Sequence, residues 1–225
     1  MKMRLPRLYV IVDRATLDRR GLLVEDFARE LRDAGVTLLQ YRDKNGGPQE
    51  VLRAAADISA VFAGVETTLV MNDRADLAVL AGWNAVHVGQ GDLPPEDAKV
   101  VLRTIPHPSQ EREEWATHRG GFVGVSTHTV EQVIAADAGA ANYVAVGPVF
   151  ATSTKLNAEP VVGLEGVRWA RALTAKPLVA IGGITLENAW SVVEAGADSV
   201  AVIGGVFVEG RSVGEVARDF LEILR

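Results

Sequence analysis

The sequence contains no cysteine, and this absence excludes both a disulfide framework and a zinc site built from thiolates. It also lacks any uninterrupted apolar run near the roughly 18 residues that a membrane-spanning helix requires. The basic start, residues 1–6, is not followed by the apolar core of a signal peptide. We therefore expect a cytoplasmic protein that does not use a membrane.

An excess of positive charge is also lacking, because the formal net charge is −6 at pH 7. A protein that binds nucleic acid needs a positive field around it, so we expect no nucleic-acid partner. If this protein binds an anion, it must do so with a few placed groups rather than with a basic surface.

The 225 residues instead show a regular alternation of two kinds of segment. Eight apolar runs, rich in β-branched residues or leucine, are typical of strands covered on both faces. They span residues 8–12, 37–41, 68–71, 85–88, 122–125, 143–146, 177–181 and 199–203. Amphipathic segments separate them at residues 24–34, 49–62, 76–81, 95–103, 130–138, 164–173, 187–195 and 214–224. This α/β alternation predicts parallel strands in one domain, residues 1–225, folded as a single (β/α)₈ TIM barrel. An open, doubly wound sheet is the alternative.

Four Ala-Gly pairs support the barrel. Gly35, Gly82, Gly139 and Gly196 each end a predicted helix, once in every second strand–helix unit. A quarter-barrel repeat predicts this recurrence, and we expect each glycine to be left-handed, as a helix C-terminus favours.

Two segments fit the alternation less well. Residues 13–22 indicate a polar loop after the first strand, and residues 106–121 indicate a polar loop that is long for a helix-to-strand link. The second loop follows a helix, so it belongs on the face opposite the usual active site of a barrel, and we assign it no chemistry.

Polar side chains at the end of the second strand are the first candidates for chemistry, because functional groups in a barrel sit just after the strands. Alternation places Gln40 and Arg42 on one face, and Lys44 follows on the loop. An inward arginine beside a lysine is costly to bury without an anionic partner. An ion pair between Arg42 and Asp43 at the rim is the alternative.

Two aspartates follow the third and fourth strands. Asp73 and Asp92 stand at corresponding ends of neighbouring strands, where their carboxylates can converge. Mg²⁺ takes one or two carboxylates and completes its shell with water and substrate phosphate. The pair therefore predicts a Mg²⁺ site, with helix N-caps as the alternative for each residue.

The fourth and fifth strands add His87 and Ser126. His87 fits either a core histidine bonded to a carbonyl or a contact to a heteroaromatic substrate, and the sequence leaves both open. Ser126 has no evident base beside it, so we interpret it as a hydroxyl donor rather than a nucleophile. Thr129 precedes a helical segment and predicts an N-cap.

The last three strands end in groups suited to phosphate. Thr152, Ser153, Thr154 and Lys155 give a loop whose hydroxyls and ammonium group can hydrogen-bond anionic oxygens at two neighbouring points. Glycine pairs at 182–183 and 204–205 place bare backbone at the usual phosphate position of a barrel. A plain polar turn and tight glycine turns are the respective alternatives.

Taken in order, these motifs resemble the thiamine phosphate synthase family from residue 8 to the C-terminal helix, with residues 106–121 as the main departure. The motifs are Gln40-Tyr41-Arg42-Asp43-Lys44, Asn72-Asp73, His87-Val88-Gly89-Gln90-x-Asp92, Gly124-Val125-Ser126, Gly147-Pro148 with Thr152-Ser153-Thr154-Lys155, and Ile181-Gly182-Gly183-Ile184. The resemblance implies a transferase that joins hydroxymethylpyrimidine diphosphate to a thiazole phosphate and releases pyrophosphate, using Mg²⁺. It also implies a dissociative reaction that needs no protein nucleophile.

The same resemblance implies the roles of the site residues. The pyrimidine diphosphate would contact Gln40, Arg42, Lys44, Asn72, Ser126 and Lys155, and the thiazole phosphate would contact Thr152, Thr154, Gly183, Ile203 and Gly204. Tyr41, Asp43, His87 and Ser153 complete the expected substrate-binding set, and Asp73 and Asp92 would hold Mg²⁺. Arg42, Lys44, Ser126 and Lys155 are the expected catalytic residues. Asp43 stands where the family commonly has Glu, and Gly204 stands where it commonly has Ser.

Two other functions are compatible with a barrel of this kind. A thiazole tautomerase would need neither the paired carboxylates nor a full diphosphate site. A non-catalytic barrel that senses a phosphorylated ligand could keep the glycine pairs and lose the acidic pair. All three take small-molecule partners, and the sequence leaves the oligomeric state open, a homo-oligomer included.

Overall fold

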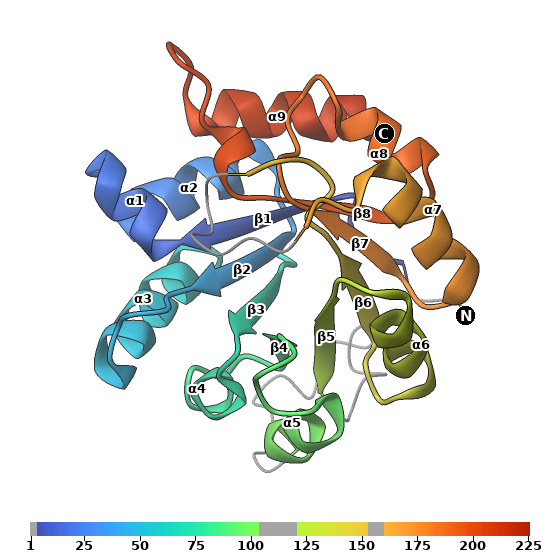
Figure 1. The fold of residues 1–225 in the computed structure, drawn as a ribbon. Helices are drawn as coiled ribbons and strands as arrows, with labels where there is room; N and C mark the ends of the chain where they lie inside the picture. Colours follow the sequence, from blue (N-terminus) through green and yellow to red (C-terminus); the bar gives the residue numbers. More distant parts are fainter. Residues whose placement is uncertain (1–3, 104–120, 153–159) are drawn as a thin grey trace.

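The structure is a computed structural model that describes residues 4–103, 121–152 and 160–225. Within them, strands pair in parallel with their neighbours along the chain, and β8 pairs with β1 to close a barrel (Figure 1). The strands are β1 (Leu8–Asp13), β2 (Leu38–Arg42), β3 (Thr68–Asn72), β4 (Ala85–Val88), β5 (Phe122–Thr127), β6 (Tyr143–Val146), β7 (Leu178–Ile181) and β8 (Ser199–Val202). The predicted (β/α)₈ barrel is confirmed, and the open-sheet alternative is wrong.

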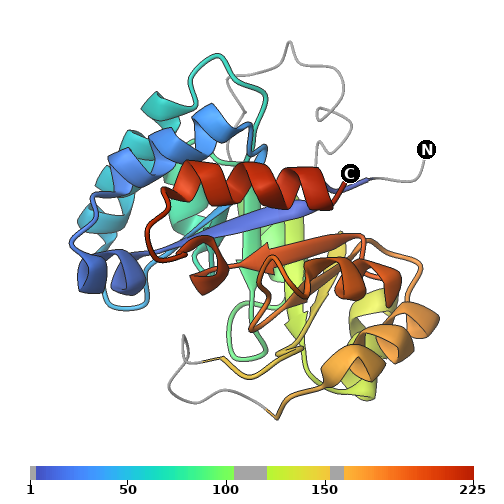
Figure 2. The ribbon, with the colours of Figure 1, turned by 90° about the horizontal axis from the view of Figure 1, so that it is seen from above.

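Helices surround the barrel on its outer side (Figure 1). They are α1 (Arg14–Arg20), α2 (Val24–Ala34), α3 (Pro48–Val61), α4 (Ala75–Leu80), α5 (Pro95–Leu102), α6 (Val130–Ala138), α7 (Gly163–Leu173), α8 (Ala189–Glu194) and α9 (Val213–Ile223), with a short 3₁₀ turn, η1 (Gly204–Val206). Figure 2 shows α9 lying alongside α2 across β1. No helix in the part of the chain that the structure describes is long and apolar enough to cross a membrane.

Strand residues are buried on both faces of the sheet, which explains the continuous apolar runs in the sequence. Tyr9 and Leu38 belong to the core inside the barrel. Their immediate neighbours Val10 and Leu39 belong to the core between the sheet and the helices. Alternate side chains of one strand therefore enter separate cores, and those that point inward near the strand ends reach the mouth of the barrel.

The prediction of a polar loop over residues 13–22 is wrong, because this segment contains helix α1. The Asp13 carboxylate accepts a hydrogen bond from the backbone N–H of Thr16 at 3.1 Å and caps the helix, while Gly21 ends it at a φ of 64°. The helix buries Thr16 and Leu17 and leaves its other faces exposed. A helix with so small a buried face carries too few apolar residues to show a helical period.

Three of the four predicted left-handed glycines are confirmed, since Gly35, Gly82 and Gly196 have φ angles of 91°, 73° and 116°. Gly139 is the exception, with a φ of −85°. A β-carbon at Gly139 would lie 2.9 Å from a carboxylate oxygen of Glu96. It would also lie 3.1 Å from the Ala135 carbonyl oxygen, so the space at Gly139 is tight although its φ is one that any residue adopts.

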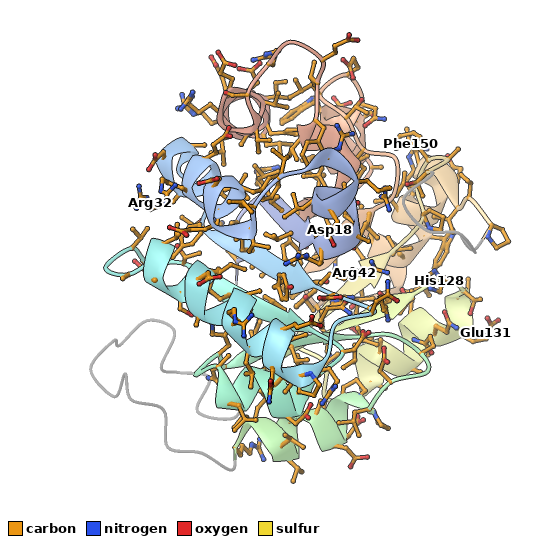
Figure 3. The ribbon with its side chains drawn as sticks, turned by 90° about the vertical axis from the view of Figure 1, so that its left-hand side faces the viewer. Asp18, Arg32, Arg42, His128, Glu131 and Phe150 are labelled. Carbon is orange, nitrogen blue, oxygen red and sulfur yellow. The ribbon has the colours of Figure 1, made fainter. Side chains whose placement is uncertain are left out.

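Segment 106–121 lies outside the described residues except for Gly121, and so do Ser153, Thr154 and Lys155. The remaining predicted site residues stand at or beside the carboxyl ends of the strands. Figure 3 shows Arg42 and His128 toward one end of the barrel, whereas Arg32, at the C-terminal end of α2, lies toward the other.

Candidate active site

The ends of β1 and β2 bring a buried ion pair to the mouth of the barrel. Asp13 and Arg42 are register partners, and the Arg42 guanidinium donates from Nη1 to Oδ1 of Asp13. The Asp13 side chain is 2% exposed and that of Arg42 is 15% exposed. The alternative pairing of Arg42 with Asp43 is therefore wrong. Sequence reasoning missed Asp13, whose signal was its place at the end of a strand.

Asp43 instead shapes the loop after β2. Its Oδ1 accepts hydrogen bonds from the backbone N–H groups of Asn45, at 3.0 Å, and Gly46, at 2.7 Å. The hydroxyl of Tyr41 donates to its other oxygen at 3.4 Å. Burial, followed by the Asp43 charge, raises the pKa of Tyr41 above its ordinary value. These contacts make Asp43 and Tyr41 supports of the loop that carries Lys44.

The loop places Lys44 against Asp73, whose carboxylate accepts from the lysine ammonium group. Asp73 has a φ of 61°, a left-handed conformation that is uncommon for a residue with a side chain. Burial raises the pKa of its carboxyl, Lys44 opposes this effect, and the nearby carboxylate of Asp92 adds to it. Lys44, Asp73 and Asp92 thus meet at one place.

Neither aspartate caps a helix by its side chain, so the N-cap alternative is wrong for both. Arg74 is the N-cap residue of α4 and Pro94 that of α5, each without a side-chain cap. The Asp92 Oδ2 instead accepts from the backbone N–H of Gly89 at 2.8 Å. Neither carboxylate is therefore used in a helix cap.

The chemistry of this group fits a hard divalent cation bound jointly by protein and substrate. Two carboxylates that repel one another supply part of an oxygen shell, and substrate phosphate and water would complete it. Within the described ranges, no three His, Cys, Asp or Glu side chains gather closely enough to hold a metal by themselves. Beside them, the Nδ2 of Asn72 is buried and has no hydrogen-bond partner among the described atoms. An unpaired amide donor is costly, and a substrate oxygen would satisfy it.

The ends of β4 and β5 bring His87 to Ser126. His87 pairs with Gly124 in register, and its Nε2 lies 2.8 Å from the Oγ of Ser126. The expectation that Ser126 has no base beside it is therefore wrong. The other ring nitrogen of His87 bonds the hydroxyl of Tyr143 at 2.9 Å, so the histidine is bonded to side chains rather than to a carbonyl there. Thr129 accepts from the backbone N–H of Gln132 and caps α6 as predicted.

The chain after β6 runs along the end of β7. The backbone N–H groups of Val149 and Phe150 donate to the carbonyls of Ile181 and Gly182, both at 2.9 Å. A cis peptide bond joins Gly147 to Pro148. This pairing carries the chain to Thr152, which lines a cavity at the ends of β7 and β8.

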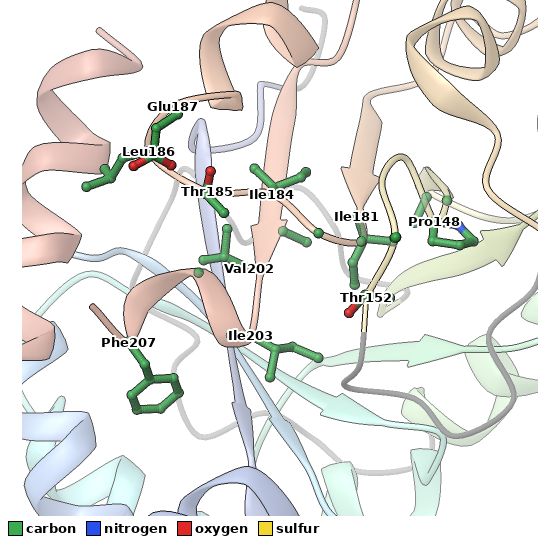
Figure 4. A pocket seen from close by; sticks show the side chains of 18 of the residues that line it. Pro148, Thr152, Ile181, Ile184, Thr185, Leu186, Glu187, Val202, Ile203 and Phe207 are labelled. Carbon is green, nitrogen blue, oxygen red and sulfur yellow. The ribbon is translucent and has the colours of Figure 1, made fainter. Parts of the chain in front are cut away.

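That cavity has a volume of about 610 Å³ (Figure 4). Thr152, Gly183, Ile203 and Gly204, all predicted to bind the thiazole phosphate, line it, and so does Ser126. A β-carbon at Gly183 would lie 2.5 Å from the Ala151 carbonyl oxygen, and the φ there is 64°. The bare backbone at Gly183 is thus a steric requirement of the turn.

Arg20 also lines this cavity, and sequence reasoning missed it because its helix was predicted as a loop. Its guanidinium lies 4.1 Å from the centroid of the Phe207 ring, which stacks on Phe27. Among the described residues, no carboxylate pairs with Arg20. Arg20 therefore brings a positive charge to the glycine-lined end of the mouth, in a cavity that Glu187 also lines.

Fold and geometry together define a (β/α)₈ barrel whose functional groups, two acidic side chains, cationic side chains and glycine turns, gather at the carboxyl ends of the strands. The chain matches the family model described as thiamine monophosphate synthase over residues 8–105 and 107–206. The chain belongs to this family.

Individual relatives agree with the family. A thiamine-phosphate synthase of Koribacter versatilis is 48% identical over 99% of this chain and 97% of the relative. One of Methanoregula boonei is 40% identical over 96% of this chain and 91% of the relative. The solved thiamine phosphate pyrophosphorylase of Pyrococcus furiosus superposes with a TM-score of 0.78 at 28% identity, covering 97% of this chain and 95% of that one.

Proposed function

We propose that this chain is a thiamine-phosphate synthase, which joins hydroxymethylpyrimidine diphosphate to hydroxyethyl-methylthiazole phosphate and releases pyrophosphate. Its partners are then these two small molecules. The family membership and the similarity to named synthases along nearly the whole chain support this function. The observation that carries the chemistry is the meeting of Lys44, Asp73 and Asp92 beside the unpaired amide of Asn72.

The two substrates would occupy the two halves of the mouth. The pyrimidine diphosphate would lie over the ends of β2 to β5, where Gln40, Arg42, Lys44, Asn72 and Ser126 supply donors. The thiazole phosphate would lie in the cavity at β7 and β8, against the backbone of Gly183 and Gly204. Thr152 lines this cavity, and Ser153, Thr154 and Lys155 follow it in the sequence. Arg20 would add the positive charge that a phosphate dianion requires.

The reaction then follows from charge. The bond from the pyrimidine methylene carbon to the diphosphate oxygen breaks, and the electron pair leaves with pyrophosphate. The thiazole nitrogen donates its lone pair to the methylene cation and forms the new bond. Arg42 and Lys44 stabilise the charge that grows on the departing diphosphate. Mg²⁺, when bound by Asp73 and Asp92, would supply further charge neutralisation. Holding both substrates in line supplies much of the remaining rate advantage.

His87 beside Ser126 does not favour a nucleophilic mechanism. The second ring nitrogen of His87 bonds the hydroxyl of Tyr143, whereas the histidine of a Ser-His-Asp triad bonds a carboxylate at that nitrogen. The tautomerase alternative leaves the acidic pair and Lys44 unexplained, and a non-catalytic sensor likewise leaves the acidic pair of Asp73 and Asp92 unexplained.

A single assay separates these functions. Purified protein is incubated with Mg²⁺ and either or both substrates, and pyrophosphate and thiamine phosphate are measured. We expect both products only when both substrates are present. Pyrophosphate release that does not depend on the thiazole phosphate would contradict a joining reaction. Absence of release, with rearrangement of a thiazole carboxylate phosphate, would support the tautomerase.

A further inference from the structure

Five side chains form a continuous series of hydrogen bonds across the inside of the barrel. Gln40 Nε2 donates to the hydroxyl of Tyr9 at 2.8 Å, and the hydroxyls of Tyr9 and Tyr143 are 3.1 Å apart. The Tyr143 hydroxyl lies 2.9 Å from Nδ1 of His87, whose Nε2 lies 2.8 Å from Oγ of Ser126. The series joins β2 to β5 through β1, β6 and β4, and all its members except Ser126 are buried.

Donor capacity gives this series a direction. The amide nitrogen of Gln40 can only donate, so the Tyr9 oxygen accepts this hydrogen bond. The single hydroxyl hydrogen of Tyr9 is then donated to the oxygen of Tyr143. Tyr143 has one proton as well, and it goes to Nδ1 of His87. A neutral imidazole that accepts at Nδ1 carries its hydrogen on Nε2, which donates to the Oγ of Ser126. Ser126 therefore accepts from His87 and directs its own hydroxyl hydrogen toward the mouth of the barrel.

The opposite direction is the one alternative, and it would reverse every bond. A flipped Gln40 amide would accept from Tyr9, His87 would carry its proton on Nδ1, and Ser126 would donate inward to Nε2. Ser126 would then present only lone pairs to the mouth. An anionic substrate repels lone pairs and attracts hydrogen-bond donors, so the first direction suits the site and the second does not.

Burial of the two tyrosines means that the hydrogen bonds of the series change direction together. Tyr9 and Tyr143 are each 1% exposed, so neither phenol can exchange its hydrogen-bond partner for solvent. Burial also raises the pKa of both phenols, which keeps each a neutral group with one proton to give. The series therefore has two states, which differ in the tautomer of His87 and in the direction of the Ser126 hydroxyl.

We propose that Gln40, Tyr9 and Tyr143 are positioning residues that hold His87 as its Nε2–H tautomer, so that Ser126 acts as a dedicated hydrogen-bond donor to the bound pyrimidine diphosphate. The acceptor is an oxygen of the diphosphate or a ring nitrogen of the pyrimidine. The role of Ser126 rests on the proposed function, whereas the tautomer of His87 does not.

The tautomer is measured directly in the wild-type protein, without substrate. Long-range ¹H–¹⁵N spectra of histidine-labelled wild-type protein distinguish Nε2–H from Nδ1–H, and His87→Asn assigns the His87 signals by their disappearance. We expect Nε2–H in wild type and a mixture of tautomers in Tyr143→Phe, which removes the donor to Nδ1. A dominant Nδ1–H form in wild type overturns the proposal even if the enzyme is a synthase.

A double-mutant cycle tests whether Tyr143 acts through Ser126. Tyr143→Phe alone is expected to lower kcat/KM for the pyrimidine diphosphate by about tenfold, the value of one good hydrogen bond, and to leave KM for the thiazole phosphate unchanged. In a Ser126→Ala background the same substitution should cost less than about twofold. Equal losses in both backgrounds would show a general structural role and overturn the coupling.

Binding of substrate fragments identifies the acceptor. Calorimetry compares wild type with Ser126→Ala for inorganic pyrophosphate with Mg²⁺ and, separately, for unphosphorylated hydroxymethylpyrimidine. A loss of about tenfold in affinity for the first supports donation to a phosphate oxygen, and the same loss for the second supports donation to a ring nitrogen. Unchanged affinity for both fragments overturns the donor role of Ser126.

Discussion

Asp13 and Arg42 are register partners at the ends of β1 and β2, and one carboxylate oxygen of Asp13 receives the Arg42 guanidinium. The other oxygen accepts from the N–H of Thr16 at 3.1 Å and from its hydroxyl at 2.6 Å. A single buried carboxylate therefore aims the guanidinium at the mouth and also starts helix α1, which carries Arg20 to the far half of the site.

Asp13→Asn separates the ion pair from the helix cap, because asparagine is as good an N-cap residue as aspartate and carries no charge. We expect kcat/KM for the pyrimidine diphosphate to fall about tenfold or more as Arg42 loses its anchor. Breaking a buried ion pair should also lower the free energy of unfolding by about 3 kcal/mol. Steady-state kinetics and urea unfolding measure the two effects. Wild-type kinetics in a destabilised variant would show that the pair serves stability alone.

Arg20→Ala removes the one cation that the described residues of α1 bring to the cavity at β7 and β8. Because the side chain is exposed, we expect a modest effect, about a fivefold rise in KM for the thiazole phosphate, which weakens as salt is added. Arg29→Ala is the matched control, since Arg29 is an exposed arginine on α2 paired with Glu25 and Asp26. An equal rise in both variants would assign the effect to net charge.

The strands and most helices could be predicted from sequence because their buried faces carry apolar residues at the regular spacing of a strand or a helix. Helix α1 could not, since it buries only Thr16 and Leu17 among its seven residues. The Ala-Gly pattern located helix ends correctly, but at Gly139 it could not show that the helix ends without a left-handed residue.

The placement of candidate site residues at the mouth of the barrel could be predicted where a strand ends in polar groups, as at Arg42, Asp73 and Asp92. Their partners could not. Asp13 and Arg42 are 29 positions apart, and His87 and Ser126 are 39 apart, so only strand register brings each pair together. Tyr9 and Tyr143 look like ordinary core residues in an apolar run, and their hydroxyls acquire meaning only when the closed barrel makes them neighbours.

Asp92→Ala tests the proposed metal site. Loss of a carboxylate that helps to hold Mg²⁺ at the diphosphate should lower kcat by about a hundredfold or more, and excess chelator should abolish turnover. Asp97→Ala, an exposed aspartate on α5, is the control and should leave turnover unchanged. Full activity in excess chelator would refute the assignment of Asp73 and Asp92 to a metal.

Tyr9→Phe should change how stability depends on alkaline pH. Burial raises the pKa of Tyr9 above its unfolded value near 10, so the folded state retains a proton that the unfolded state loses. Stability from this group is full below about pH 10 and declines by about 1.4 kcal/mol per pH unit above it, up to the folded pKa. Urea unfolding between about pH 9 and 11 should show a shallower decline in the variant. Parallel curves would exclude Tyr9 as a source of the dependence.

The glycine pair after β8 gives the most closely matched comparison in the chain. Gly204 begins the 3₁₀ turn η1, whose backbone conformation serine readily adopts, and it stands where the family commonly has Ser. Gly204→Ser should therefore retain turnover and lower KM for the thiazole phosphate by supplying a hydroxyl donor.

At Gly205 a β-carbon would lie 2.2 Å from the Ile184 carbonyl oxygen. Gly205→Ser must shift that backbone, so it should cost about 1–3 kcal/mol of stability and raise the same KM. Kinetics and thermal unfolding of both variants measure the contrast. A large loss of turnover in Gly204→Ser would show that the phosphate lies too close to the Gly204 backbone for any side chain.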